Sequence, residues 1–278
     1  MSTLVKTKRR INSVTGTRKI TNAMELVASV KLKRFRDVMN SSDSYVSNIK
    51  SIMSHLNTMA NHEDDDKTVA TSKRLFIILN SNLGLCAHYN NDIFKFAETL
   101  LRKDDEIIPI GLKGYTHYKN QSFKLNEQYV SLNEKIDFNN VDQFAHFIMN
   151  EFHSHKYCEI HIIYMQYVNT LISRPEEETL LPITFDKDVK EDLLPPFIEP
   201  SPEELIEELE SIYVASSIYQ AMVVAQVSEQ AARNNAMKNA TDNADEILDK
   251  LKLEYNKARQ GAITQEITEV ISGAGELE

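Results

Sequence analysis

The sequence is poor in residues that interrupt helices and in residues that cross-link chains. Glycine and proline occur only seven times each in 278 residues, and residues 203–260 contain neither. Cys86 and Cys158 are the only cysteines, too few for a disulfide framework, so we expect ordinary buried thiols in a reducing compartment. No apolar run approaches the roughly 18 residues of a membrane helix, and residues 1–19 lack the apolar block of a signal peptide. We therefore expect neither a membrane span nor export.

The lack of helix breakers is most pronounced at the C-terminal end of the chain. Strong helix formers fill most positions there, which predicts one coiled-coil helix over residues 203–278. At 1.5 Å per residue, roughly 70 residues would extend about 105 Å, several times the width of a domain core. Something outside this chain must therefore cover part of the helix.

The second half of this helix has the spacing of a coiled-coil seam, with apolar and small residues alternating three and four apart. The predicted seam is Met237, Ala240, Ala244, Ile247, Leu251, Glu254 and Ala258. The first half has a broader apolar stripe, typical of a helix that packs on a domain. Its members are Leu205, Leu209, Ile212, Tyr219, Met222 and Val223.

A second long helix is predicted over residues 1–60, with a seam of the same kind. Its positions are Ala28, Lys31, Phe35, Val38, Ser42, Tyr45, Ile49, Ile52, Leu56 and Met59. Two seams at opposite ends of one chain can pair. The simplest arrangement is a long antiparallel coiled coil closed by an inserted domain.

Residues 73–200 lose the helical period and alternate between strand and helix patterns. Strands are predicted at 75–79, 106–110, 159–165 and 180–185, the last an edge strand carrying Pro182, and helices at 93–101 and 142–153. The fold class is therefore α/β, a small domain with a largely parallel sheet inserted in the coiled coil. Residues 62–67 are expected to be an exposed acidic loop, and 195–202 a stiff proline-rich link.

Charge is distributed unevenly along the chain. Residues 1–40 carry ten Lys or Arg against Glu25 and Asp37, a net charge of +8. The remaining residues therefore carry −18, which gives the total of −10. The basic start allows a solvated helix face, a membrane or nucleic-acid patch, or a contact with acidic protein loops. No aromatic residues are interleaved with these charges, so base stacking is unsupported and we expect no nucleic-acid partner.

No motif predicts catalysis or a bound cofactor. The turn after the first strand, residues 80–87, has one glycine and no Lys-Ser or Lys-Thr pair, and Gly111-Leu-Lys-Gly114 is predicted to be only a turn. The group His153, His155, Cys158 and His161 matches no four-ligand zinc pattern. We also find no Ser, His and Asp triad, so catalytic, cofactor-binding and metal sites are all expected to be absent.

The C-terminal strings resemble a known family. Ser-Glu-Gln-Ala-Ala-Arg at 228–233, Ala-Met-Lys-Asn-Ala-Thr-Asp-Asn-Ala at 236–244, Tyr-Asn-Lys-Ala-Arg-Gln at 255–260 and Ile-Thr-Gln-Glu at 263–266 are similar to the signature of the gamma subunit of F-type ATP synthases. Residues 11–33, Gly84-Leu-Cys86 with Asn90, and residues 110–114 resemble the same family.

This resemblance implies a central rotor shaft with no catalytic role of its own, coupling ATP turnover in a ring of alpha and beta subunits to rotation and proton transport. It implies MgATP and MgADP on the partner subunits, an epsilon-type subunit, a membrane ring, and a cytoplasmic position on the inner face of the cell membrane. The positions that match family contacts with the catalytic subunits are Lys19, Met24, Arg233, Gln260 and Thr264. A possible ring-facing loop comprises Asn82, Gly84, Leu85, Cys86, Ala87 and His88.

This loop departs from the family pattern. The family usually has Asp at the position of Asn82 and glycines at those of Ala87 and His88, and here Glu276 and Glu278 stand at the usually apolar C-terminal end. Two alternatives therefore remain open. One is a gamma-like shaft of a related ATPase that is not coupled to a proton ring, and the other is a free-standing coiled-coil adaptor with an α/β head.

The missing phosphate loop leads to the first prediction: the purified chain does not bind MgATP, because no glycine-rich turn with a Lys-Ser or Lys-Thr pair can hold the phosphates. Titration calorimetry should show no heat beyond dilution. Saturable binding at micromolar MgATP would contradict the prediction.

Overall fold

The computed structural model describes residues 3–59, 72–184, 199 and 201–275. These form two compact units, one made from the chain up to Ala28 and from Arg233 onward, the other from Ser29–Ala232. Helix α1 spans Thr3–Met59 and helix α5 spans Pro202–Gly275, so each terminal helix contributes to both units. None of the helices in the described ranges is long and apolar enough to cross a membrane.

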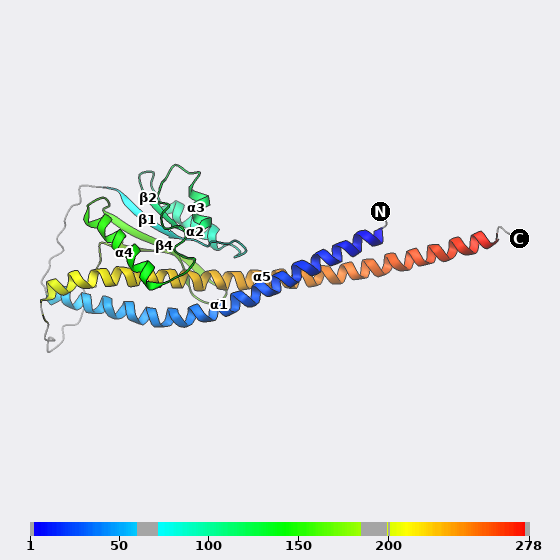
Figure 1. The fold of residues 1–278 in the computed structure, drawn as a ribbon, viewed down its shortest axis with the longest axis horizontal. Coiled ribbons are helices and arrows are strands. Elements are labelled where there is room, and N and C mark those ends of the chain that lie inside the picture. Colours follow the sequence, from blue (N-terminus) through cyan, green and yellow to red (C-terminus); the bar gives the residue numbers. More distant parts are fainter. Residues whose placement is uncertain (1–2, 60–71, 185–198, 200, 276–278) are drawn as a thin grey trace. The chain divides into compact units, whose positions relative to one another are not determined.

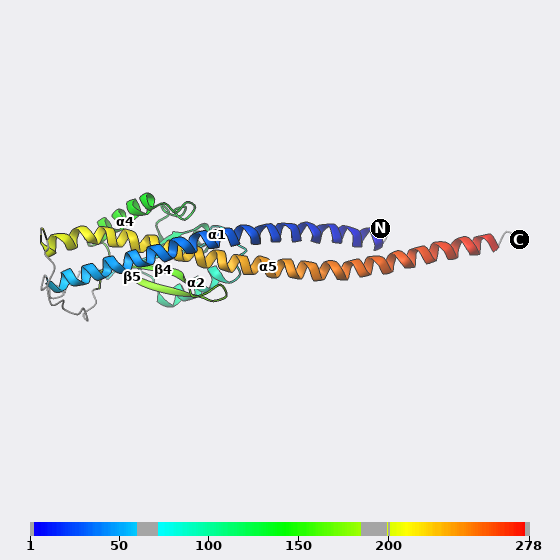
Figure 2. The ribbon, with the colours of Figure 1, turned by 90° about the horizontal axis from the view of Figure 1, so that it is seen from below.

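In the first unit, α1 and α5 lie side by side and antiparallel (Figures 1 and 2). The Arg18 Nε lies 2.5 Å from the Asp245 Oδ1, and the Thr241 hydroxyl donates to the Thr21 hydroxyl at 2.8 Å. The Asn234 side chain donates to the Glu25 carbonyl at 3.1 Å. Residue numbers on α5 fall as those on α1 rise, which confirms the predicted antiparallel pairing.

The spacing of both seams is confirmed, but their register differs by one residue at every second position. On α1, Lys31, Tyr45 and Ile52 are exposed, and the inward places are taken by Leu32, Val46 and Met53. On α5, Ile247 and Glu254 are exposed where Leu248 and Tyr255 face inward. Counted from Ala28 on α1 and from Met237 on α5, the inward positions are spaced by four and then three residues, whereas the prediction had three and then four. Adjacent apolar pairs such as Tyr45–Val46 and Ile247–Leu248 satisfy either order, so periodicity alone could not choose.

The second unit contains a five-stranded sheet in the order β3-β2-β1-β4-β5. The first four strands are parallel, and β5 runs antiparallel to β4 at the edge. The strands are β1 (Arg74–Leu79), β2 (Glu106–Ile110), β3 (Lys124–Leu125), β4 (Glu159–Tyr167) and β5 (Ser173–Leu181). The helices between them are α2 (Tyr89–Leu100), α3 (Leu112–Tyr118) and α4 (Phe138–His153). This confirms the predicted α/β insert with a largely parallel sheet.

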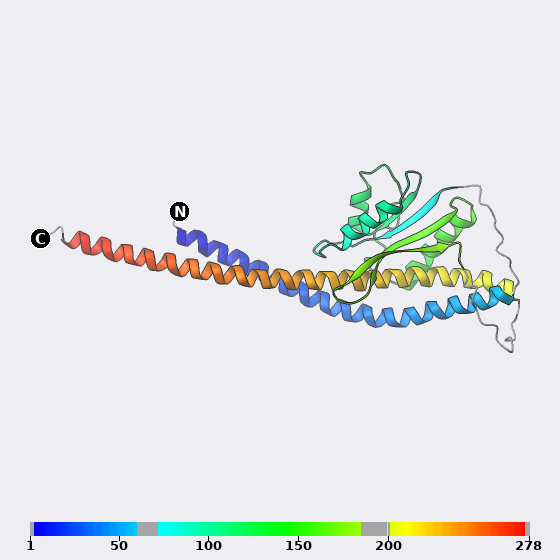
Figure 3. The ribbon, with the colours of Figure 1, turned by 180° about the vertical axis from the view of Figure 1, so that it is seen from behind.

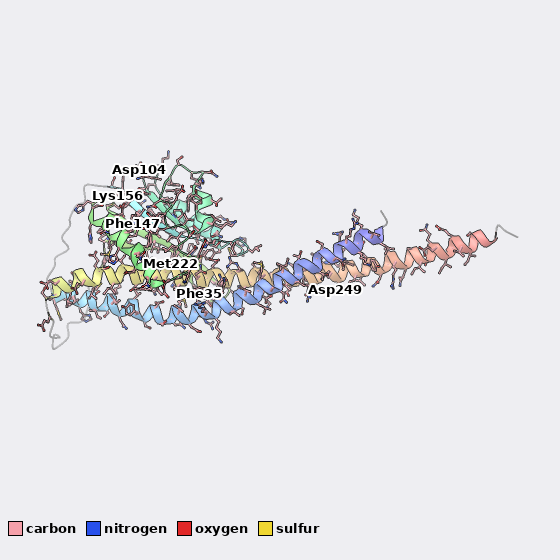
Figure 4. All side chains as sticks on the ribbon, in the orientation of Figure 1. Phe35, Asp104, Phe147, Lys156, Met222 and Asp249 are labelled. Carbon is pink, nitrogen blue, oxygen red and sulfur yellow. The ribbon has the colours of Figure 1, made fainter. Side chains whose placement is uncertain are left out.

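Alternate residues of the central strand β1 enter two different cores. Leu75 and Ile77 join the core formed with α4, α5 and the second half of α1, whereas Phe76 and Ile78 join the core formed with α2 and α3. Phe147 of α4 and Met222 of α5 belong to the first core (Figure 4). Figure 3 shows the sheet between these layers. Burial on both faces is what the continuous apolar run of β1 requires.

Several sequence predictions in this region are corrected by the structure. The edge strand runs from Ser173 to Leu181 and ends before Pro182, because the polar stretch 173–179 is recruited by pairing with β4 and has little apolar pattern of its own. The predicted turn at Gly111–Gly114 is instead the start of α3. Cys86 is buried as predicted, but Cys158 is only partly buried. The predicted acidic loop at 62–67 lies outside the described residues, as do 195–198 and 200 of the proline-rich link.

Glu178 on β5 provides a test of this packing. Burial raises the pKa of its carboxyl group above the ordinary value, and this outweighs the nearby Lys50 ammonium, which acts to lower it. The folded state therefore holds the Glu178 proton more tightly than the unfolded state, so stability is lost as pH rises from about 4.3, the ordinary Glu pKa, through the raised pKa. Glu178→Gln should remove this loss.

Urea unfolding of the purified chain at several pH values between about 4 and 7 measures the effect. The difference in unfolding free energy between Glu178→Gln and the parent chain should grow in favour of the variant as pH rises. Glu134→Gln, at an exposed carboxylate, is the control. Parallel pH profiles for the parent and Glu178→Gln would contradict the prediction.

Candidate functional site

The structure places the predicted contact residues in two separate groups. Lys19 and Met24 on α1, with Arg233, Gln260 and Thr264 on α5, belong to the first unit. The predicted ring-facing loop belongs to the second unit, at the carboxyl end of β1. Each group therefore has its own local geometry.

The helical residues differ in accessibility. Lys19, Gln260 and Thr264 are exposed, Met24 is half-buried, and Arg233 is only 7% exposed. The Thr264 hydroxyl donates to the Gln260 carbonyl at 2.9 Å, so these two residues lie one helical turn apart. Arg233 is therefore buried by the chain itself, and the sequence pattern gave no signal of this burial.

The end of α5 exposes apolar side chains that were not among the predicted sites. The pairs Arg18–Asp245 and Thr21–Thr241 fix the antiparallel register, which brings the first turn of α1 level with about residue 258. Figure 2 shows α5 continuing past the N-terminal end of α1. Ile263, Ile267 and Val270 are 47–72% exposed in this stretch. Their spacing of four and three residues was the available sequence signal for an interaction surface.

A polar network organises the loop after β1. The Asn90 amide donates to the Ser81 hydroxyl at 2.8 Å and lies 3.4 Å from the Cys86 sulfur, and its oxygen accepts from the Ser81 amide at 3.1 Å. The Ser81 hydroxyl in turn donates to the Leu83 carbonyl at 2.7 Å. Asn90, at the start of α2, therefore ties both ends of the loop together.

The same loop is tied to the start of α3. The Asn82 side-chain oxygen accepts from the Leu112 amide at 3.0 Å, and the Ser81 carbonyl accepts from the Lys113 amide at 3.1 Å. Gly111 has φ of 113°, and a Cβ there would lie 2.2 Å from the Asn80 carbonyl oxygen. Only glycine allows the two loops to approach this closely.

The loop also contains residues with left-handed backbone. Ala87 has φ of 50° and Leu85 has φ of 63°. Glycine adopts this conformation without the steric cost that a Cβ introduces. Ala87, which stands where the family usually has a glycine, thus keeps a backbone conformation that suits glycine.

The position of the loop along α5 can be read from two hydrogen bonds. The Tyr89 hydroxyl donates to the Ala225 carbonyl at 3.3 Å, and the Ser228 hydroxyl donates to the Met165 carbonyl at 2.8 Å. The α5 residues of these two bonds, Ala225 and Ser228, both lie more than twenty residues from Pro202, or roughly 35 Å along the helix. Within the second unit, the loop therefore lies away from the ends of α1 and α5 at Met59 and Pro202.

The residues considered for zinc are directed to different neighbours. The His161 ring is stacked on Phe76 and lies between the carboxylates of Glu177, at 2.5 Å, and Glu159, at 3.1 Å. His153 faces Glu210 at 3.7 Å. The Cys158 thiol donates to the Lys73 carbonyl at 3.3 Å. These contacts make His161 a link between β4 and β5.

Comparison with known proteins gives matches over the whole chain. Residues 3–277 match the sequence family described as ATP synthase. The chain is 33% identical to the ATP synthase gamma chain of Desulforamulus reducens, with 98% of each chain covered. It is 35% identical to that of Mycoplasmopsis synoviae, with 99% of each covered. The rotor of the Euglena gracilis mitochondrial ATP synthase shares the fold with a TM-score of 0.66 at 17% identity, over 94% of this chain and 99% of that one.

The close approach at Gly111 gives a prediction about the loop. Gly111→Ala should lower the unfolding free energy by at least about 2 kcal/mol, because the new Cβ would clash with the Asn80 backbone and the positive φ would be strained. Gly84→Ala is the control, since its Cβ would meet only the Lys113 side chain, at 3.7 Å. Urea unfolding measures both, and equal stabilities would show that the approach is not required.

Proposed function

Because the chain belongs to the family of ATP synthase gamma chains, we propose that it is the central rotor shaft of a rotary F-type ATPase. In this role it couples ATP turnover in a ring of three alpha and three beta subunits to rotation and proton transport. The family assignment confirms the resemblance seen in the C-terminal strings. The observation that carries the function is the match over almost the entire length of both chains.

The first unit has the properties that a shaft requires. Its part of α5, residues 233–275, would extend about 65 Å at 1.5 Å per residue. A seam of buried Met237, Ala244, Leu248 and Leu251 pairs it with α1. Beyond the seam, its exposed side chains can make many weak contacts with a surrounding ring. Such contacts can be exchanged during rotation, unlike one tight interface.

Catalysis is assigned to the partners. A parallel sheet typically holds phosphate at the carboxyl end of its strands, where the loop after β1 lies. Here that loop is tied by Asn82 to the amide of Leu112 and by Ser81 to the amide of Lys113. We assign MgATP and MgADP to the alpha and beta subunits, no cofactor to this chain, and a non-catalytic role to its residues. An epsilon-type subunit and a membrane ring complete the proposed assembly, which would place the chain peripherally on the inner face of the cell membrane.

The proposed function is tested directly by rotation. The native complex is purified, fixed through its beta subunits, and a bead is attached to this chain. MgATP should drive unidirectional rotation of the bead. A complex that hydrolyses ATP while the bead remains still would refute the shaft role.

The exposed polar residues near the end of α5 give a prediction about turnover. Replacing Gln260 and Thr264 with Ala should leave assembly intact, because both side chains are exposed and Ala favours helix. It should slow ATP hydrolysis several-fold by removing hydrogen bonds made at particular rotational angles, each worth about 1 kcal/mol. Asn256→Ala, also exposed on α5, is the control. Arg233→Ala should instead lower the stability of the chain itself, because that side chain is buried within it.

A second prediction concerns the loop that departs from the family. Ala87→Gly with His88→Gly should change the stability little, because glycine relieves the left-handed backbone at Ala87 but adds unfolded-state entropy at His88, whose φ of −86° is ordinary. If the loop faces a membrane ring, the change should alter proton-linked ATPase activity in membranes. Unchanged coupling would mean that the departure has no functional role. A native complex that purifies with no membrane ring would favour the uncoupled ATPase.

A further inference from the structure

The second unit contains a cavity that the proposed shaft role does not use. It lies between α1 and α5 beside the first residue of α4, and has a volume of about 300 Å³. Aromatic and aliphatic side chains form its walls and serines provide its polar groups. Its lining includes Val38, Ser42, Tyr45, Phe138, Ser216 and Tyr219.

The walls suit a flat apolar ring. The rings of Phe138 and Tyr219 meet edge to face, with their centroids 5.7 Å apart. Tyr45 and Phe138, both in the lining, are 53% and 43% exposed. Burying them against an aromatic ligand is favourable. The volume is at the lower limit for small-molecule sites, so the ligand must be small.

One hydroxyl at the cavity lacks the hydrogen bond that helical hydroxyls usually make. Thr241 and Thr264 each donate to the carbonyl four residues earlier, and Ser42 donates to the Met39 carbonyl at 3.0 Å. Ser216 is 3% exposed, and its Oγ has no hydrogen-bond partner among the described residues. A buried hydroxyl without a partner is costly, so a ligand that offers a hydrogen-bonding group gains what the chain itself does not provide.

We propose that this cavity binds a small neutral aromatic molecule with one hydroxyl group. The ring packs against Phe138, Tyr219 and Tyr45, and the hydroxyl pairs with Ser216, which turns toward the ligand. Charged ligands are disfavoured because the lining offers hydroxyl groups and apolar surface.

Two probes of nearly equal shape, p-cresol and p-xylene, separate the hydroxyl from the ring. Ligand-observed NMR on the purified full chain should give a Kd on the order of 1 mM for p-cresol and about five-fold weaker binding for p-xylene. Ser216→Ala should abolish this preference for p-cresol. Ser217→Ala is the matched control, since Ser217 is equally buried, likewise without a partner among the described residues, and does not line the cavity. Phe138→Ala should weaken both probes.

Three outcomes would overturn the proposal. Equal binding of both probes would remove the role of Ser216, and equal effects of Ser216→Ala and Ser217→Ala would show a general change in α5. Binding of p-cresol to the full chain but not to the assembled complex would mean that a neighbouring subunit covers the cavity. None of these outcomes bears on the shaft role, which depends on rotation.

Discussion

The antiparallel pairing of the two terminal helices is the constraint on which the rest of the structure depends. In the first unit the buried seam of α5 pairs with α1. In the second unit the same two helices share one apolar core, and Gln220 donates to Asp43 across them at 2.7 Å. A long helix has little stability from propensity alone, so this packing is what keeps both helices formed. The inserted sheet adds a further apolar face to α5.

Burial on several sides explains the composition of α5 in the second unit. From Tyr213 to Ala225 most side chains are buried, and many are Ala, Val or Ser. Small side chains allow α1 and the sheet to approach the same helix. The polar residues that follow are used as links, as when Ser228 donates to the Met165 carbonyl. Within the buried stretch, the hydroxyls of Ser216 and Ser217 have no hydrogen-bond partner among the described residues.

Sequence patterns predicted which helices and strands form better than they predicted the bounds and the register of those elements. The absence of Gly and Pro predicted α5, and continuous apolar runs predicted β1, β2 and β4, because these signals are local. The register of each seam required knowledge of the partner, since Val46 and Tyr45 are equally suitable by pattern. The bounds of β5 were wrong and α3 was missed, because pairing with β4 sets the extent of β5 and the start of α3 is tied to a distant residue, Asn82. The expected contact positions could be taken from the family resemblance, but the burial of Arg233 could not.

The part of α5 proposed to meet the catalytic ring is the part least stabilised by its own chain. Beyond about residue 260 almost all described side chains are exposed, and the visible stabilising contacts are local. The Gln265 amide donates to Glu269 at 2.8 Å, and Thr268 donates to the Thr264 carbonyl at 2.8 Å. A side-chain pair such as Gln265–Glu269 contributes only about 0.2–0.5 kcal/mol, and a threonine hydroxyl bonded to the carbonyl four residues earlier does not add to helix stability. A surrounding ring would therefore supply the burial that Ile263 and Ile267 lack, so that folding of this end and assembly of the motor depend on the same contacts.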